Sequence, residues 1–444
     1  MIYDLQQTDD PRDIVHRSVQ TLVEGGVIGL PSETVYGLVA SALCVDAVKK
    51  LVQIISHGNP TGNLQWGQIA LCIRSSESVG DYLLPQTLLA RRLTERCFPG
   101  PLTLVSDCSA DGSAVCMLPQ EVQRLLRQPA NGGGKTGDLG KEAAFRVSKH
   151  RLLSHIHRYL SAPLIWGEFP VEPAPADSPS SPNRGATTIT ALSEQIDRSA
   201  PEANLPLLLD DGVSRYGGVG TVVRAAGNSW QILREGVIQR AAMNQFVKPV
   251  IAIVCTGNTC RSPMAETLLR DLLHKKFGRE DVVRVISAGV AAGRGSGAAP
   301  QSVEVMGRLG LDLTGHCSQP LDDPLMSMSD LVLTMTRRHR DAILAAWPDR
   351  KDRVFTLRRD GGDISDPVGM PVDIYEQCAQ QMRGELEQWI EALDDDFFPN
   401  TSDAATLEGH NGNEAPGPAN EDVPPKNGLD RGDTDDPHHH GDLT

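Results

Sequence analysis

The stretch from Val250 to Pro263 constrains the fold more than any other part of this 444-residue chain. An apolar run ends at Cys255, and a short polar segment with one glycine leads into a helical pattern that starts near Met264. A strand that delivers a tight loop onto a helix N-terminus brings free backbone N–H groups together, and the helix dipole there favours negative charge. This order of elements predicts an anion-binding loop in an α/β fold.

Two side chains of this loop carry reactive chemistry. Cys255 stands at the strand end, where the same N–H groups and Arg261 favour its thiolate form. Arg261 follows six residues later and can form a bidentate pair with two phosphoryl oxygens. A thiolate below a bound phosphoryl group is placed for in-line attack, which gives a cysteinyl-phosphate intermediate. The whole string predicts a phosphatase site, whereas Cys-x5-Arg alone is weak, because nine cysteines give many chances for an accidental arginine.

A buried structural cysteine and half of a zinc site are the alternative interpretations of Cys255. No second cysteine or histidine pair lies nearby in the sequence at the spacing that zinc ligands need, so phosphate chemistry is favoured. The neighbouring Cys260 has two open interpretations. It is either a thiol that captures oxidised Cys255 in a reversible disulfide or a residue that only packs the loop.

Residues 248–395 resemble the low-molecular-weight protein tyrosine phosphatases, whose loop reads Cys-x5-Arg-Ser near the start of the domain. The resemblance implies that Asp366, followed by proline, is the general acid that protonates the leaving atom. It also implies that Asn258 braces the loop, that Ser262 donates a hydrogen bond to the thiolate, and that no metal or cofactor is needed. The remaining residues of the expected phosphate-binding loop are Thr256, Gly257, Thr259 and Cys260.

The residues around this loop bear on the substrate. Tyrosine-specific members of the family usually carry a bulky aliphatic residue at the position of Thr259 and aromatic residues after Asp-Pro, where this chain has Val368 and Gly369. Thr259 is similar to the bacterial protein-arginine phosphatase branch, because a small polar residue leaves room for a guanidinium group, although an aromatic at position 368 is expected there too. The resemblance therefore implies a phosphorylated protein as partner, with phosphoarginine favoured over phosphotyrosine.

The N-terminal half begins with an amphipathic helical pattern that is broken at Gly25-Gly26. The segment 27–30 then indicates a buried strand, and a polar segment at 31–38 follows it. The generic interpretation is a strand–turn–strand unit of an α/β domain. The functional interpretation is a loop that faces a ligand through a carboxylate, hydroxyls and a phenol.

This loop resembles the start of the YrdC-type threonylcarbamoyl-AMP synthase family, with Ser32 in place of the usual threonine. Four later stretches match the family in the right order, at 98–104, 144–147, 218–223 and 233–236. The resemblance implies an α/β domain with a twisted mixed sheet. The candidate ligand site that it implies consists of Ser32, Glu33, Thr34, Tyr36, Arg146, Thr221 and Arg234.

The activity implied by this second resemblance is synthesis of threonylcarbamoyl-AMP from threonine, bicarbonate and ATP for tRNA modification. Release of pyrophosphate needs positive charge on the phosphates, from basic residues, Mg²⁺ or both. Here 56–60 replaces the family's Lys-x-Arg-Pro segment, and 164–170 replaces its Ser-Ala-Asn segment. We therefore expect either a synthase that uses ATP or a module that binds a nucleotide or tRNA-related ligand without catalysis.

Composition limits the remaining possibilities. The net charge of −15, to which residues 401–444 contribute ten acidic and two basic residues, argues against a general nucleic-acid binder. No stretch approaches the roughly 20 apolar residues of a membrane helix, and the N-terminus lacks the profile of a signal peptide. We expect a cytoplasmic protein with reduced cysteines and no membrane partner.

The expected organisation has three parts. A YrdC-like domain occupies residues 1–245, with a short linker at 241–247. A doubly wound phosphatase domain with a parallel sheet follows at residues 246–395. The composition then changes to mostly polar and acidic residues, which predicts a disordered acidic tail over residues 396–444.

Overall fold

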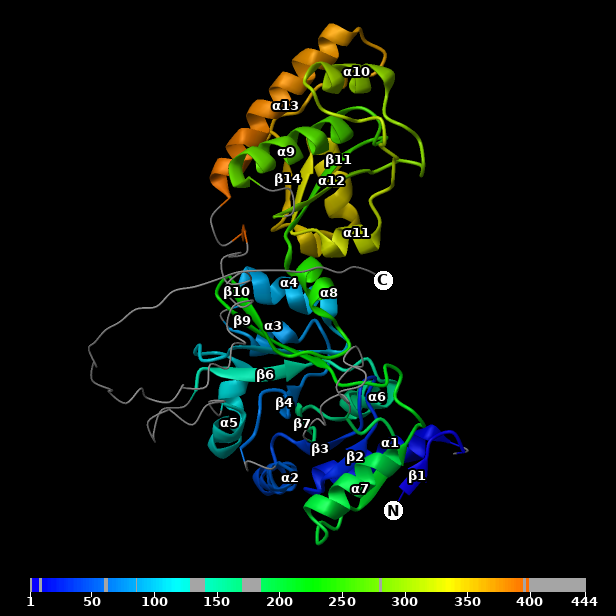
Figure 1. The fold of residues 1–444 in the computed structure, drawn as a ribbon, viewed down its shortest axis with the longest axis vertical. Helices are drawn as coiled ribbons and strands as arrows, with labels where there is room; N and C mark the ends of the chain where they lie inside the picture. Colours follow the sequence, from blue (N-terminus) through cyan, green and yellow to red (C-terminus); the bar gives the residue numbers. More distant parts are fainter. Residues whose placement is uncertain are drawn as a thin grey trace, which may run out of the picture.

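The computed structural model describes residues 2–7, 10–59, 63–84, 86–127, 140–169, 185–278, 282–393 and 397–398. Within these ranges two separate β-sheets, each covered by helices, form two bodies that are stacked along the long axis (Figure 1). The predicted acidic tail lies, apart from residues 397–398, outside the described residues. In the part that the structure covers, no helix is both long and apolar enough to cross a membrane.

A ten-stranded mixed sheet forms the centre of the N-terminal body. Its strands are β1 (Ile2–Asp4), β2 (Ile28–Leu30), β3 (Gly37–Ser41), β4 (Ile69–Cys72), β5 (Leu102–Asp107), β6 (Glu142–Arg146), β7 (Leu164–Gly167), β8 (Leu207–Asp210), β9 (Thr221–Ala226) and β10 (Ser229–Arg234). They lie in the order β1-β8-β2-β3-β7-β4-β6-β5-β9-β10. β2 pairs antiparallel with β3 and parallel with β8, which confirms the predicted mixed sheet.

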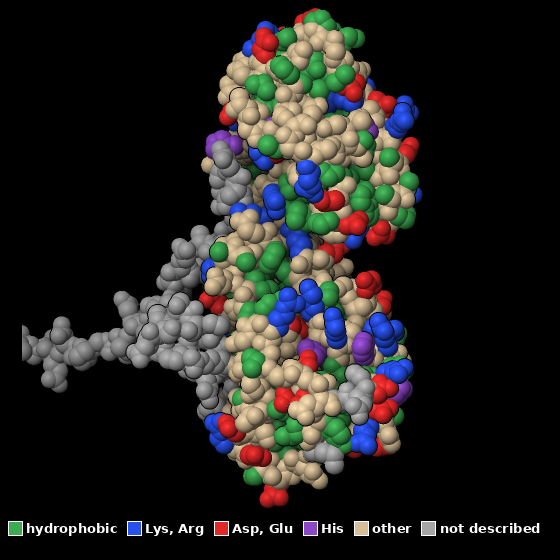
Figure 2. Space-filling model, turned by 90° about the vertical axis from the view of Figure 1, so that its right-hand side faces the viewer, with side chains coloured by type: hydrophobic (Ala, Val, Ile, Leu, Met, Phe, Trp, Pro, Cys, Tyr) green, Lys and Arg blue, Asp and Glu red, His purple; other side chains and the backbone are tan. Residues whose placement is uncertain are grey.

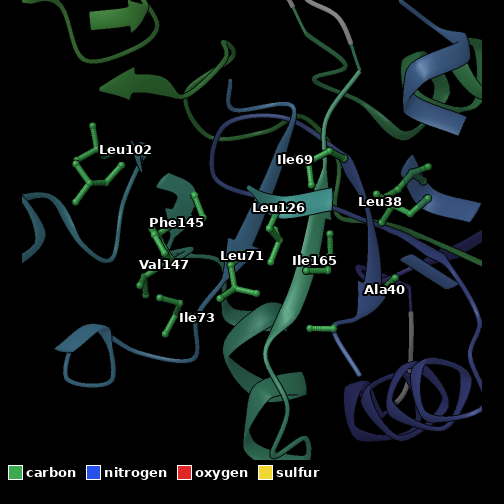
Figure 3. Close-up of a cluster of buried hydrophobic side chains, with 14 of the residues drawn as sticks. Leu38, Ala40, Ile69, Leu71, Ile73, Leu102, Leu126, Phe145, Val147 and Ile165 are labelled. Carbon is green, nitrogen blue, oxygen red and sulfur yellow. The ribbon is translucent and has the colours of Figure 1, made fainter. Parts of the chain in front are cut away.

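Helices cover both faces of this sheet because successive residues of a strand point to opposite sides. In β3, Leu38 and Ala40 join the core beneath α2, α5 and α7, whereas Val39 joins the core beneath α1 and α6. Figure 3 shows side chains of the first core, among them Leu71 and Phe145. The helices of this body are α1 (Pro11–Val23), α2 (Val45–His57), α3 (Val79–Tyr82), α4 (Leu88–Cys97), α5 (Gln120–Leu126), α6 (Arg151–Tyr159), α7 (Ile189–Ser199) and α8 (Arg240–Val247), with the 3-10 helix η1 (Ala114–Met117).

The C-terminal body has four parallel strands in the order β12-β11-β13-β14. They are β11 (Val250–Cys255), β12 (Arg284–Gly289), β13 (Leu331–Thr334) and β14 (Val354–Thr356). The helices are α9 (Arg261–Phe277), α10 (Pro300–Arg308), α11 (Asp323–Met328), α12 (Arg337–Ala346) and α13 (Val372–Ala392), with the 3-10 helix η2 (Pro348–Arg350). Ile251 and Ile253 pack against α9 and α13, whereas Ala252 and Val254 pack against α11 and α12. Helices on both faces of a parallel sheet confirm the predicted doubly wound arrangement.

Two segments near the expected boundaries differ from the sequence-based interpretation. The linker predicted at 241–247 is wrong, because these residues belong to α8, with Met243 and Val247 buried in the N-terminal core. The packed part of the C-terminal body also continues past residue 395. Phe397 and Phe398 are buried in its core, and the ring of Phe398 lies 4.9 Å from that of Phe277.

Arginines of α4 join the two bodies through Asp330, the residue before β13. Arg92 Nε donates to Asp330 Oδ1 at 3.0 Å, and Arg96 Nη2 donates to Asp330 Oδ2 at 2.7 Å. The backbone amide of Val250 donates to the same Oδ2 at 2.7 Å, so Asp330 also holds the start of β11. The side chains of Arg92 and Arg96 are only 1% and 8% exposed. Both ion pairs are therefore largely removed from water.

A second carboxylate of α4 extends this contact. Glu95 accepts two hydrogen bonds from Arg353, at 3.0 Å and 2.9 Å, and one from Arg350 at 3.1 Å. We call Arg92, Glu95 and Arg96, with Asp330 and Arg353, the α4 clamp. Helices α4 and α8 lie where the two bodies meet (Figure 1), and the surface narrows there, with basic and acidic side chains nearby (Figure 2). The clamp thus makes one continuous charged contact between the bodies.

Asp330→Asn should lower the free energy of unfolding by about 3 kcal/mol, because two nearly buried arginines would lose the counter-charge that they share. Urea unfolding of the full chain measures the change. The matched control is Glu121→Gln, because Glu121 pairs with Lys49 away from the clamp and both side chains are about half exposed, so its loss should cost at most about 1 kcal/mol. Equal effects of the two substitutions would contradict a buried ionic contact at Asp330.

Candidate active site

The anion loop, residues 255–262, lies at the carboxyl ends of the four parallel strands. It connects β11 to α9, and β11 lies between β12 and β13. In such sheets the connections from the central strands leave toward opposite faces, which opens a crevice at the carboxyl edge. The α4 clamp lies at the other end of these strands, because Asp330 precedes β13 and binds the amide of Val250, the first residue of β11. The loop is therefore at the opposite end of the sheet from the N-terminal body.

Several backbone amides of the anion loop have no acceptor in the part of the chain that the structure describes. The N–H groups of Thr256, Gly257, Thr259 and Cys260 donate to no residue in the described ranges. They precede the N-terminus of α9, a helix of 17 residues whose dipole adds positive potential. Unpaired amides at a helix N-terminus favour a bound anion such as phosphate.

The sulfur of Cys255 lies inside this loop. Its Sγ is 3.0 Å from Ser262 Oγ and accepts a hydrogen bond from the amide of Asn258 at 3.2 Å. The residue is 3% exposed. Contacts with Ser262 and Asn258 thus hold the sulfur in place within its own loop.

Asn258 has the left-handed backbone conformation, with φ of 55°, and it is the single non-glycine residue with positive φ among those described. Its side-chain nitrogen donates to Ser262 Oγ at 3.0 Å and to Ser287 Oγ at 2.9 Å. Its side-chain oxygen accepts the amide of Gln319 at 2.9 Å, and its carbonyl accepts His316 Nε2 at 2.7 Å. These four contacts hold a conformation that costs free energy in isolation.

The structure brings Arg261 and Asp366 into contact, although 105 residues separate them in the sequence. Arg261 Nη2 donates to Asp366 Oδ2, and Arg261 Nη1 donates to the carbonyl of Ile364 at 3.0 Å. The guanidinium is almost fully buried, whereas the Asp366 side chain is 47% exposed. A fixed cation and a half-exposed carboxyl group thus stand side by side next to the anion loop.

Cys260 is buried against α13. Its Sγ lies 3.7 Å from the hydroxyl of Tyr375 and 3.7 Å from that of Thr259. Burial and the neighbouring Cys260 raise the pKa of Tyr375 to about 12, so the phenol remains protonated near neutral pH. Cys260 therefore contributes to packing between the loop and α13.

Two histidines that were not predicted from the sequence lie next to the loop. His316 contacts Asn258, as described above, and His339 Nε2 lies 2.8 Å from the Thr256 hydroxyl. Neither residue belongs to a local motif that could have marked it. One feature could have pointed to His339: it lies in the first turns of α12, which follows β13, a neighbour of β11 in the sheet.

The expected N-terminal site forms a buried ionic cluster. Arg146 Nη2 lies 3.3 Å from Glu33 Oε1, and its guanidinium stacks over the ring of Trp166. Glu168 then bridges the two arginines, because its carboxylate oxygens lie 2.8 Å from Arg234 Nη1 and 3.9 Å from Arg146 Nη1. The structure thus brings Glu33, Arg146 and Arg234 together with Glu168.

The other four residues of the expected N-terminal set form hydrogen bonds outside this ionic cluster. The hydroxyl of Ser32 donates to the carbonyl of Val35, and that of Thr221 donates to the carbonyl of Ile238. The carbonyl of Thr34 accepts the hydroxyl of Ser214, and the phenol of Tyr36 donates to the carbonyl of Gly212. Burial raises the pKa of Tyr36, which keeps its phenol neutral.

The residues of this cluster do not fit an ATP site with a metal ion. Arg146 and Arg234 are already paired with Glu33 and Glu168, and both carboxylates are 3% exposed. A triphosphate would therefore meet two buried negative charges, which is unfavourable. Among the described residues, no group of three His, Cys, Asp or Glu side chains is placed to hold a metal ion by protein ligands alone.

Gly289→Ala should weaken binding of inorganic phosphate to the loop by at least about tenfold. An added Cβ would lie 2.4 Å from the carbonyl oxygen of Thr256 and 3.0 Å from the amide of Asn258, so the loop would have to shift and its donors would lose alignment. Calorimetric titration with phosphate measures the affinity. Gly293→Ala, where a Cβ meets nothing within 4 Å, is the matched control. Unchanged affinity in Gly289→Ala would show that the loop tolerates the shift.

Two family models match separate parts of the chain. The model described as low molecular weight phosphotyrosine protein phosphatase matches residues 250–398. The Sua5/YciO/YrdC model, described as telomere recombination, matches residues 20–236. The two matched ranges correspond to the two bodies of the fold.

Individual relatives match the C-terminal part. The protein-arginine-phosphatase of Bacillus subtilis is 40% identical over 150 residues, which are 33% of this chain and 97% of the relative. A probable low molecular weight protein-tyrosine-phosphatase, EpsP, of Ralstonia nicotianae is 36% identical over 141 residues, which are 32% of this chain and 92% of the relative.

A solved structure of the YwlE arginine phosphatase from Geobacillus stearothermophilus is 33% identical, covers 37% of this chain and 99% of its own, and has a TM-score of 0.30. Both the matching family model and the near-complete coverage of these relatives concern the body that contains the anion loop. The chain therefore belongs to the low molecular weight phosphotyrosine protein phosphatase family through its C-terminal region, and it carries a YrdC-like region before it.

Proposed function

We propose that the C-terminal region removes phosphoryl groups from proteins, with Cys255 as the nucleophile, Arg261 as the phosphoryl clamp and Asp366 as the general acid. One arrangement carries this proposal: the buried sulfur of Cys255 lies in a loop with several amides that have no acceptor among the described residues, and Arg261 of the same loop contacts Asp366. The amides and the guanidinium can hold the phosphoryl oxygens, while the sulfur faces the phosphorus from below.

The proposed reaction has two steps. In the first, the Cys255 thiolate forms a bond to phosphorus while the bond to the leaving nitrogen or oxygen breaks, and Asp366 gives its proton to that leaving atom. In the second, water attacks the phosphorus of the cysteinyl-phosphate, Asp366 takes a proton from that water, and the thiolate leaves with inorganic phosphate released. Asp366 is half exposed and can turn from Arg261 to the leaving group once the phosphoryl group binds the guanidinium.

We infer phosphoarginine as the preferred substrate over phosphotyrosine. Thr259 is half-buried beside Cys260, and its small polar side chain leaves space above the loop for a guanidinium group. Val368, which follows the Asp-Pro pair, is 63% exposed and offers no aromatic ring to stack on a phenyl group. The similarity to protein-arginine-phosphatases, at 40% identity, supports the same choice.

The test compares phosphate release by the full chain from a phosphoarginine protein and from a phosphotyrosine peptide. We expect kcat/KM for phosphoarginine to exceed that for phosphotyrosine by at least about tenfold, a difference in transition-state contacts of roughly 1.4 kcal/mol. Thr259→Ile should reduce or reverse the preference, because a larger apolar side chain fills the guanidinium space. Cys255→Ser is the negative control, since it should remove turnover of both substrates and still bind phosphate. A preference for phosphotyrosine in the unaltered chain would refute the substrate choice alone.

Asp366→Asn should lower kcat by roughly 10²–10⁴-fold for substrates with poor leaving groups and much less for an activated aryl phosphate, because only a poor leaving group needs the proton. Measuring kcat for an aryl phosphate series of increasing leaving-group pKa tests this. Asp363→Asn provides a control on the same loop, because this carboxylate contacts Arg337 rather than Arg261. An equal loss for all leaving groups would contradict a general-acid role for Asp366.

A second candidate activity is formation of threonylcarbamoyl-AMP by the N-terminal region. The family match over residues 20–236 favours it, whereas the pairing of Arg146 and Arg234 with buried carboxylates opposes it. The test is incubation of the full chain with threonine, bicarbonate and ATP, followed by detection of pyrophosphate. Release of pyrophosphate that requires threonine would support the synthase activity, and no release would contradict it. We place the phosphatase activity first because the chain carries every residue that the proposed reaction needs, namely Cys255, Arg261 and Asp366.

A further inference from the structure

His339 links α12 to the first residue after Cys255. Its Nε2 lies 2.8 Å from Thr256 Oγ1, and its own backbone amide donates to Thr336 Oγ1, the cap of α12. The side chain is 7% exposed, and its other ring nitrogen, Nδ1, has no hydrogen-bond partner among the described residues. The contact with Thr256 is therefore the one polar interaction that the ring makes there.

The direction of this hydrogen bond follows from burial. A buried N–H without an acceptor is less favourable than a buried lone pair without a donor. The neutral ring therefore carries its hydrogen on Nε2 and donates it to the Thr256 hydroxyl. Burial lowers the pKa of His339, and the positive charge of Arg261 lowers it further, so the ring stays neutral near pH 7. Arg338 acts in the same direction, whereas Asp363 and Asp366 act against it.

Thr256 is held from both sides of β11. On the β12 side, Val290 N donates to the carbonyl of Cys255 at 2.9 Å, and Ala291 N donates to that of Thr256 at 3.0 Å. In a trans peptide the N–H points away from the preceding C=O, so the first of these bonds turns the Thr256 N–H away from Val290. On the β13 side, His339 holds the Thr256 side chain. The orientation of the first unpaired amide of the loop thus depends on both contacts.

We propose that His339 is a positioning residue of the phosphatase: by holding the Thr256 hydroxyl, it aims the Thr256 amide at the bound phosphoryl group. This inference rests on the proposed function of the loop. It assigns His339 no proton transfer and no contact with the substrate. The role requires a hydrogen-bond donor at the position of Nε2, and it does not require a side chain that changes its charge. A residue that only stabilised the fold would not need a donor at this position.

A double-mutant cycle tests the link. His339→Ala and Thr256→Val each remove one partner, and each should lower kcat/KM by about tenfold. The double variant should lose no more than either single variant, because both changes remove the same contact. His339→Gln should restore kcat/KM to within about threefold, since its side-chain N–H can reach the same hydroxyl. Losses that multiply in the double variant, or no recovery with glutamine, would overturn the proposal.

The same variants in a Cys255→Ser background separate this inference from the proposed function. Inorganic phosphate should bind them with the same non-additive losses, although no turnover occurs. Ile343→Val, which trims the buried face of α12 away from the loop, is the control for helix destabilisation and should leave phosphate affinity unchanged. If the losses of phosphate affinity are non-additive but the unaltered chain shows no turnover, the phosphatase activity is refuted and the positioning role is retained. Absence of phosphate binding in every variant would overturn both.

Discussion

The left-handed conformation of Asn258 is the constraint on which the anion loop of the C-terminal body depends. An asparagine in this conformation needs outside support, and it receives support from α9, from the end of β12 and from the segment at 316–319. The turn that results places its amide on the sulfur of Cys255 and leaves the neighbouring amides unpaired. The contacts that fix the loop therefore also set the positions of the amides that the proposed reaction uses.

The two bodies balance buried charge in similar ways. In the α4 clamp, Asp330 and Glu95 pair with three arginines across the contact between the bodies. In the N-terminal cluster, Glu33 and Glu168 neutralise Arg146 and Arg234 within one body. Arg261 differs, because its partner Asp366 is half exposed and can leave. An arginine that can exchange its partner suits ligand binding, whereas fully paired buried arginines suit fixed structure.

The sequence predicted those parts of the candidate site whose residues lie close together in the chain. It did not predict contacts between residues of distant elements. Cys255 and Arg261 could be recognised because strand, loop and helix follow each other directly, and the general-acid role of Asp366 rests on resemblance alone. His339 and Glu168 could not be found, because the register of separate elements determines their contacts. The prediction of a linker at 241–247 was wrong because the alanine, methionine and glutamine residues of this segment are good helix formers. The spacing of Arg92 and Arg96, four residues apart on one helix face, was a signal that charge patterning could have used.

Because β11 and β13 start at the α4 clamp and end at the anion loop, the sheet itself is a spacer between the two bodies. Six residues of β11 at about 3.3 Å each place the loop roughly 20 Å from the clamp. Fusion in one chain therefore fixes the stoichiometry of the two regions at one to one, and the length of the sheet keeps the anion loop at this distance from the contact between them.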